Sequence, residues 1–163
     1  DARQFLLSSK DTFDIIILDL ADPLEGGPAY LLYTQEFYQA VSARLKPDGL
    51  MVTQAGPAGP LNHREVFTAI ARTLATVFPR TWPYHTYMPS FGSAWGFVLA
   101  AREASTLPGP AEIESRIAGR MAQPPRFYDP ETHRALFNLP RYLRDSLAQE
   151  QRVITEANPV YMP

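Results

Sequence analysis

Residues 14–38 read DIIILDLADPLEGGPAYLLYTQEFY and decide the fold. Four aliphatic residues, Ile15 to Leu18, end in the carboxylate of Asp19, and a second carboxylate, Asp22, follows three residues later. An aliphatic run bounded by polar and turn residues is typical of a strand buried on both faces. Acidic side chains just beyond such a strand lie at the edge where α/β sheets build their sites. The stretch therefore predicts an α/β fold with a candidate site at these two carboxylates.

The composition is that of one folded domain. Of the 163 residues, 45% are hydrophobic and 20% are charged, which is enough for a real core. The net charge of −2 predicts no bulk attraction to nucleic acid or to an anionic membrane. The lack of cysteine excludes a disulfide framework, a thiolate metal site and a cysteine nucleophile. Because the chain begins at Asp1 without methionine, we expect residue 1 to be an internal position of a longer protein.

The remaining pattern predicts strands that alternate with helices. In order, the predicted elements are a helix over 1–10, a strand over 13–20, a helix from Thr34, a strand over 50–54, a helix from Asn62, and strands over 80–88 and 95–101. Such alternation favours a mostly parallel sheet that closes with an antiparallel hairpin. Pro83 predicts that its strand is an edge strand or contains a bulge.

Local signals predict where the helices begin and end. Thr34 is a suitable N-cap, and KPDG at 46–49 should stop the helix that follows it. Asn62 and Glu65 have the spacing of a capping box. The buried stripe predicted for that helix consists of Val66, Ile70, Leu74 and Phe78.

The pattern changes after residue 104. A linker at 107–110 precedes a helix over 111–121, and prolines predict two further helix starts at 129–130 and 139–140. The tail from 151 to 163 has no helical period. We therefore divide the chain into a sheet portion, 1–104, and a part of helices and tail, 105–163.

Asp19 and Asp22 allow two interpretations. Two carboxylates in one cleft can hold a cation or divide base and binding roles, and an amine would relieve their repulsion. Alternatively, Asp22 and Pro23 form a turn and Asp19 caps neighbouring backbone. A metal site is less favoured, because no histidine lies near them in the sequence. Gln54 ends the next predicted strand and can face the same crevice.

Other polar and aromatic residues give weaker signals. His63, His85 and His133 show no metal-ligand spacing. Most aromatic residues near the loops are expected in the core, while one or two can line a pocket for an aliphatic or cationic substrate. These aromatics are Tyr30, Tyr33, Tyr38, Tyr84, Tyr87, Phe91 and Trp95. No GxGxxG turn, nucleophile elbow or P-loop is present.

The chain resembles the aminopropyltransferases, which are the spermidine, spermine and thermospermine synthases. The motifs that carry the resemblance are DLADP at 19–23, GPA at 27–29, LY at 32–33, EFY at 36–38, LKPDG at 45–49, Gln54, PSF at 89–91 and YDPETHRALFNLP at 128–140. The segments EGGPAY at 25–30 and TQAGPAG at 53–59 are most similar to the thermospermine-synthase branch.

The resemblance implies a fold and a reaction. The fold is the C-terminal portion of a Rossmann-like sheet of the S-adenosylmethionine-methyltransferase type, flanked by helices and followed by a helical extension. A small β-domain and the glycine-rich cofactor half are expected before Asp1. The reaction is transfer of an aminopropyl group from decarboxylated S-adenosylmethionine to putrescine or spermidine, releasing methylthioadenosine. A cytoplasmic homodimer or homotetramer is implied, with no metal, no tightly bound cofactor, and no nucleic-acid or membrane partner.

The resemblance also implies residue roles. Asp19 corresponds to the general base, Asp22 to the anchor of the attacking amine, and Gln54 to a polar residue of the amine pocket. Phe91 stands where many spermidine synthases have a tyrosine. The residues implied at the nucleoside are Asp1, Ala2, Asp19, Pro28 and Ala29. Two alternatives stay open, namely a methyltransferase that uses S-adenosylmethionine and a non-catalytic module that kept the fold. Without the preceding half, we expect this chain alone to be inactive.

Overall fold

Four strands form one mixed sheet in the computed structural model, which describes residues 1–103 and 105–163. They are β1 (Phe13–Leu18), β2 (Leu45–Pro57), β3 (Arg80–Met88) and β4 (Ser93–Ala101), in the spatial order β1-β2-β4-β3. Only β1 and β2 are parallel, so the described sheet is mixed rather than mostly parallel. The predicted α/β class and closing hairpin are confirmed, and Pro83 lies in the edge strand β3 as expected.

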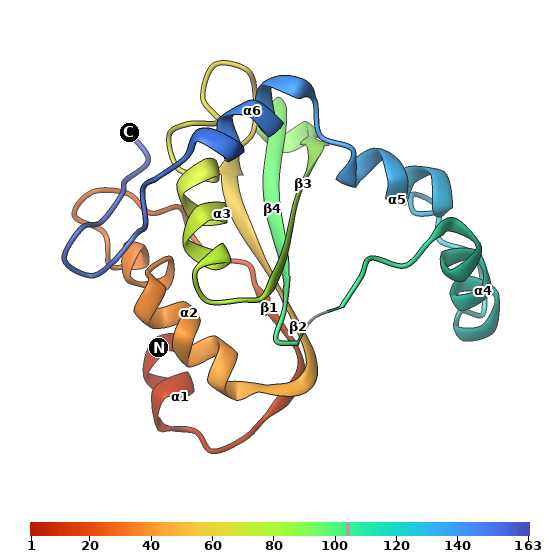
Figure 1. The fold of residues 1–163 in the computed structure, drawn as a ribbon, viewed down its shortest axis with the longest axis horizontal. Helices are drawn as coiled ribbons and strands as arrows, with labels where there is room; N and C mark the ends of the chain where they lie inside the picture. The colour runs from red at the N-terminus through yellow and green to blue at the C-terminus, as the bar shows by residue number, and fades with distance from the viewer. Residues whose placement is uncertain (104) are drawn as a thin grey trace.

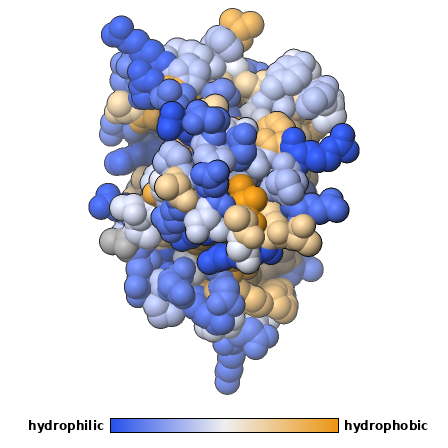
Figure 2. Space-filling view, turned by 90° about the vertical axis from the view of Figure 1, so that its right-hand side faces the viewer, coloured by the Kyte–Doolittle hydropathy of each residue, from blue (hydrophilic) through white to orange (hydrophobic). Residues whose placement is uncertain are grey.

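The helices form two groups (Figure 1). One group packs beside the sheet and consists of α1 (Ala2–Ser8), α2 (Gln35–Arg44), α3 (Phe67–Ala75) and α6 (Arg141–Gln149). The other consists of α4 (Pro110–Arg120) and α5 (Pro130–Phe137), which lie beyond β3. Seen from the α4–α5 side, small apolar clusters are separated by hydrophilic residues (Figure 2). The core lies between the sheet and the first group of helices, because the fully buried side chains are found there. Examples are Tyr38, Phe67, Met51, Ile70 and Leu74.

Helix α2 follows its sequence signals closely until its last turn. The Thr34 hydroxyl accepts a hydrogen bond from the Phe37 amide, as predicted for an N-cap. The helix ends at Arg44, and the KPDG segment lies within the long strand β2 rather than outside it. Phe13 pairs with Leu45, whereas Ile15 pairs with Leu50, so the register between the two strands shifts at residues 46–49.

Helix α3 begins later than predicted. Residues 60–66 form turns, and the helix starts at Phe67 without a side-chain cap. The prediction of a capping box at Asn62 and Glu65 is therefore wrong. The reason is tertiary, because the buried ring of His63 hydrogen bonds to the Gly59 carbonyl and to the Ser146 hydroxyl of α6. The buried stripe itself is confirmed for Val66, Ile70, Leu74 and Phe78.

Strand β1 is covered on one face only. Leu18 is buried in the core, but the side chains of Ile15 and Ile17 are 62% and 70% exposed. The prediction of burial on both faces is therefore wrong for this structure, because β1 is an edge strand and the helices pack on the opposite face. The strand also ends at Leu18 rather than at residue 20. In α1, Leu6 is buried as expected, whereas Phe5 is 53% exposed.

The C-terminal part is helical and then extended, as its sequence predicts. Asp129 caps α5 by accepting a hydrogen bond from the Thr132 amide, and Pro130 occupies the first turn. Pro140 precedes α6 as its N-cap. The predicted domain boundary at residue 104 lies outside the described residues. None of the helices formed by the described residues has the length and apolar character needed to cross a membrane.

The tail crosses the helix layer and is fixed to it. Ile154 is fully buried, its amide donates to the Thr73 hydroxyl of α3, and its carbonyl accepts from the Gln35 amide of α2. Just before it, the Glu150 carboxylate accepts hydrogen bonds from Thr68 and Arg152. Residues without helical period are thus held by specific polar contacts.

Substitution of Gly96 by alanine should destabilise the fold. A β-carbon at this position would lie 2.3 Å from Cδ2 of Phe67, which is fully buried between α3 and the sheet. We expect Gly96→Ala to lower the free energy of unfolding by about 1–3 kcal/mol in urea denaturation. Gly119→Ala in α4 is the matched control, because its β-carbon meets nothing within 4 Å. Equal losses for both variants would contradict the packing.

The Glu150 cluster should make stability depend on pH. Burial raises the pKa of Glu150, but hydrogen bonds from Arg152 and Thr68 outweigh it and lower the pKa from 4.5 to about 2. The stabilisation is therefore present above pH 4.5 and is lost as the pH falls from 4.5 to 2. We expect Glu150→Gln to melt below the wild type at pH 7, with a difference that shrinks toward pH 2.

The control for this pH dependence is Glu112→Gln, which breaks an exposed ion pair with Arg116 within α4. Such a pair contributes little, so its melting difference should be small at every pH. A Glu150→Gln difference that stays constant from pH 7 to pH 2 would refute the assignment.

Candidate functional site

A pocket of about 640 Å³ opens on the exposed face of the sheet. Its floor has one side chain from each strand, namely Ile17 of β1, Val52 of β2, Phe97 of β4 and Tyr84 of β3. Strand register places these residues on one face, because Ile17 pairs with Val52, and Gln54, two residues further along β2, pairs with Phe97. Phe97 in turn pairs with Tyr84. The floor is consequently apolar and follows directly from the sheet order.

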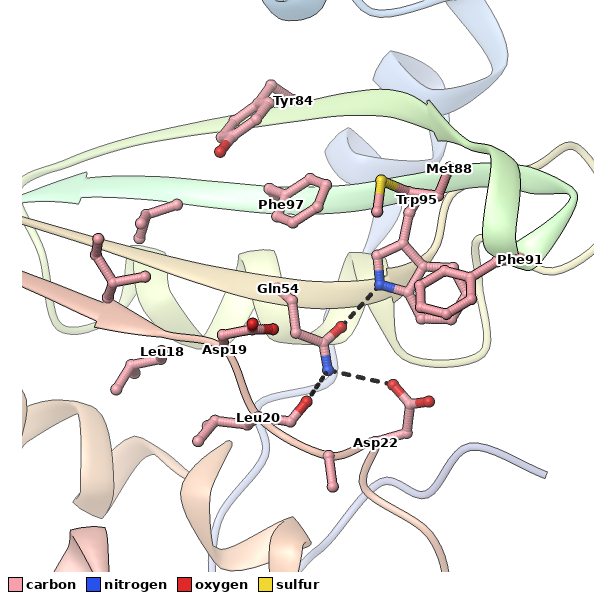
Figure 3. Close-up of a pocket in the computed structure, with 13 residues that line it drawn as sticks. Leu18, Asp19, Leu20, Asp22, Gln54, Tyr84, Met88, Phe91, Trp95 and Phe97 are labelled. Carbon is pink, nitrogen blue, oxygen red and sulfur yellow. Dashed lines mark hydrogen bonds between the residues drawn. The ribbon is translucent and has the colours of Figure 1, made fainter.

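Two carboxylates stand at the rim of this pocket. Asp19 follows the last residue of β1 and is exposed, whereas Asp22 lies three residues further and is half-buried. The parallel pairing of Leu18 with Thr53 places the end of β1 beside Gln54 of β2. Figure 3 shows the two carboxylates on either side of the Gln54 side chain. The predicted meeting of these three residues is thus a result of strand pairing.

The Gln54 amide is buried and fully engaged in hydrogen bonds. Its Nε2 lies 3.0 Å from the Leu20 carbonyl oxygen, 3.2 Å from Oδ1 of Asp22 and 2.5 Å from Oη of Tyr33. Its Oε1 accepts from the indole Nε1 of Trp95 and from the Gly56 amide, both at 2.9 Å. One side chain thereby connects β2, β4 and the loop that carries Asp22.

Tyr33 also hydrogen bonds to the loop that carries Asp22. Its ring is fully buried, and its hydroxyl donates a hydrogen bond of 3.0 Å to the Ala21 carbonyl. Burial, followed by the negative charge of Asp22, raises the pKa of Tyr33 well above its ordinary value. The phenol therefore stays protonated and keeps its donor role at all ordinary pH values.

Two aromatic side chains form the remaining wall, namely Phe91 and Trp95, whose ring centroids lie 4.5 Å apart. On the floor, Tyr84 stacks on Phe97 at 5.3 Å. Tyr84 also packs against Phe137 of α5, which connects the pocket to the second helix group. Aromatic faces beside carboxylates suit an elongated aliphatic ligand that carries positive charge.

The structure brings together half of the predicted site residues. Asp19, Asp22, Gln54 and Phe91 line the one pocket, whereas the other four predicted residues do not line it. Asp1 instead caps α1 by accepting a hydrogen bond from the Gln4 amide. Pro28 and Ala29 begin a 3-10 turn, Pro28–Leu32, and Ala2 begins α1. Their contacts with a nucleoside stay predictions.

The sequence does not predict two hydrogen-bonding partners of Gln54. Tyr33 and Trp95 were expected only as aromatics of the core or a pocket wall, but both bind the Gln54 amide. The antiparallel pairing of β4 with β2, which brings Trp95 to β2, has no local sequence signal. Among the described residues, no group of three or more histidine or carboxylate side chains could hold a metal ion.

Comparison with known proteins identifies the family. The model of the spermine/spermidine synthase domain matches residues 1–108. Polyamine aminopropyltransferase 2 of Hyperthermus butylicus is 42% identical over 164 residues, which cover 100% of this chain and 53% of that protein. Polyamine aminopropyltransferase of Sulfolobus acidocaldarius is 40% identical, with 100% of this chain and 54% of that protein covered. The chain belongs to the spermine/spermidine synthase family, as its motifs predict.

Solved structures of the family share the fold. A spermidine synthase in complex with the transition state analogue AdoDATO superposes with a TM-score of 0.77 at 27% identity, covering 91% of this chain and 49% of that one. Spermidine synthase from Thermotoga maritima gives 0.74 at 25% identity, with 92% and 48% covered. The chain spans about half the length of the curated relatives it matches.

Removal of the Gln54 amide should destabilise the site and the fold together. Gln54→Leu would leave buried donors and acceptors on Trp95, Gly56 and Leu20 without their partner. We expect it to lower the free energy of unfolding by about 2–3 kcal/mol in urea denaturation. Gln35→Leu, which removes one exposed hydrogen bond to Thr76, is the control and should cost less than about 0.5 kcal/mol. Equal stability of both variants would contradict the network.

Proposed function

We propose that this chain is the C-terminal catalytic part of an aminopropyltransferase of polyamine biosynthesis. It would transfer an aminopropyl group from decarboxylated S-adenosylmethionine to putrescine or spermidine and release methylthioadenosine. The observation that carries the proposal is that Asp19 and Asp22 line one pocket with an apolar floor and an aromatic wall. The names of the relatives and the AdoDATO complex of a spermidine synthase support it.

The two carboxylates would divide the chemistry. A protonated amine is not a nucleophile, so Asp19 would first take a proton from the attacking ammonium group. The amine nitrogen then forms a bond to the methylene carbon next to the sulfonium sulfur, and the carbon–sulfur bond breaks. The electron pair stays on sulfur, which becomes neutral, so the leaving group needs no acid. Asp22 would hold the amine in line for this attack.

The remaining predicted residues would surround the substrates. Gln54 would form part of the amine pocket, and Phe91 would offer a ring face in place of a hydrogen bond. The nucleoside would contact Asp1, the N-cap of α1, and Ala2, its first residue, together with Asp19 and the turn at residues 28–29. Because the chain spans about half the length of its relatives, we propose that the rest of the nucleoside site lies outside it. Residues 1–163 alone would then turn over little substrate.

We also propose the cellular location, the oligomeric state and the partners of the enzyme from its family. It would act in the cytoplasm as a homodimer or homotetramer, with a polyamine substrate and without nucleic-acid or membrane partners. The family relatives that are named as polyamine aminopropyltransferases support the substrate class. Decarboxylated S-adenosylmethionine would be a co-substrate rather than a resident cofactor.

Loss of the Asp19 carboxylate should remove the base. In the whole gene product, we expect Asp19→Asn to reduce kcat/KM for aminopropyl transfer by at least about 10²-fold. The same assay should show a raised KM for the amine in Asp22→Asn. Asp14→Asn is the matched control, because Asp14 is the second residue of β1, at the end of the strand away from Asp19, and forms an exposed ion pair with Lys46. A wild-type rate in Asp19→Asn would remove Asp19 from the mechanism.

The reaction type can be tested separately from the residues. The whole gene product is incubated with decarboxylated S-adenosylmethionine or with S-adenosylmethionine and a panel of amines, and the products are identified by mass spectrometry. We expect methylthioadenosine and an amine longer by one aminopropyl group. Methyl transfer without aminopropyl transfer would overturn the proposal.

A further inference from the structure

The end of the tail lies against the loop that carries Asp22. The amide of Met162 donates a hydrogen bond of 3.0 Å to the carbonyl of Pro23, the residue directly after Asp22. Leu24 and Met162 form a parallel β-bridge, and the ring of Tyr161 packs edge-on against Tyr30 at 5.5 Å. Two segments nearly 140 positions apart are therefore joined beside a residue of the site.

The loop has few contacts of its own. Between β1 and the 3-10 turn it contains two internal backbone hydrogen bonds, from Leu24 to Asp22 and from Gly27 to Leu24. Leu24 is 49% exposed, and Gly26 has a φ of 77° that other residues rarely adopt. A segment with so few contacts samples many conformations unless other elements hold it.

The tail is itself firmly held, so it can restrain the loop. Ile154 is fully buried and hydrogen bonds to both α2 and α3, as described above. Nearer the loop, Val160 and Met162 are partly buried against the core. Gln54 and Tyr33 hold the side of the loop before and at Asp22, and Met162 holds the carbonyl of the residue after it.

We propose that Tyr161 and Met162 are positioning residues that fix the Asp22 loop in the conformation that binds the amine. The inference rests on the proposed function, in which Asp22 anchors the substrate. Because the tail fixes the loop in advance, less conformational freedom is lost when the amine binds. The tail would therefore act on amine affinity and leave the proton transfer at Asp19 unchanged.

The test removes one hydrogen bond at the tail. In the whole gene product, Met162→Pro eliminates the amide that donates to Pro23. We expect the KM for the amine to rise about threefold to tenfold, the equivalent of one ordinary hydrogen bond, while kcat stays within about twofold. Amide hydrogen exchange measured on peptides covering residues 20–30 should become faster in this variant.

A conservative variant and a second site complete the experiment. Met162→Leu keeps the amide and should restore the wild-type KM. Tyr161→Ala removes the ring that packs against Tyr30 and leaves the backbone hydrogen bond to Pro23 in place. If Met162→Pro does not fold, the amine KM of Tyr161→Ala tests whether the tail positions the loop. Wild-type protein that forms no aminopropyl product would refute the proposed function. Active wild-type protein with unchanged amine KM and unchanged exchange in Met162→Pro and Tyr161→Ala would refute only the inference about the tail.

Discussion

The buried amide of Gln54 is the interaction on which the site depends. It bonds to the indole of Trp95 on β4, to the hydroxyl of Tyr33 and to the loop between Leu20 and Asp22. A buried amide with unpaired atoms would be costly, whereas a satisfied one makes its surroundings rigid. The position of the Asp22 carboxylate is therefore tied to the strand that carries Gln54.

One face of the sheet carries the core, and the other carries the pocket. The face toward α2 and α3 is filled with large buried side chains and supplies the stability. The other face carries Ile17, Val52, Phe97 and Tyr84 as the pocket floor and is left open. Because successive residues of a strand point to opposite faces, Gly96 contacts the core while Phe97 contacts the pocket. Stability and chemistry are thus set by neighbouring positions of one strand.

Much of the fold could be predicted from local patterns. The strand at the aliphatic run of β1 and the cap at Thr34 depend on signals close in sequence, and these predictions hold. The edge position of Pro83 follows from the backbone N–H that proline lacks. The start of α3 could not be predicted, because the contact of His63 with Ser146 overrides the capping signal at Asn62. The exposure of Ile15 and Ile17 depends on what covers the sheet, which their own sequence does not encode.

The meeting of three candidate site residues could also be predicted from local patterns. Two acids after a strand and a glutamine after the next one indicated where polar groups would meet, and Asp19, Asp22 and Gln54 do line one pocket. The roles of Tyr33 and Trp95 required the antiparallel register of β2 with β4. The close approach of Phe67 to Gly96 couples two positions that lie far apart in the sequence. A side chain fits at position 96 only where position 67 carries something smaller than a phenylalanine ring, so the residue tolerated at position 96 depends on the residue at position 67.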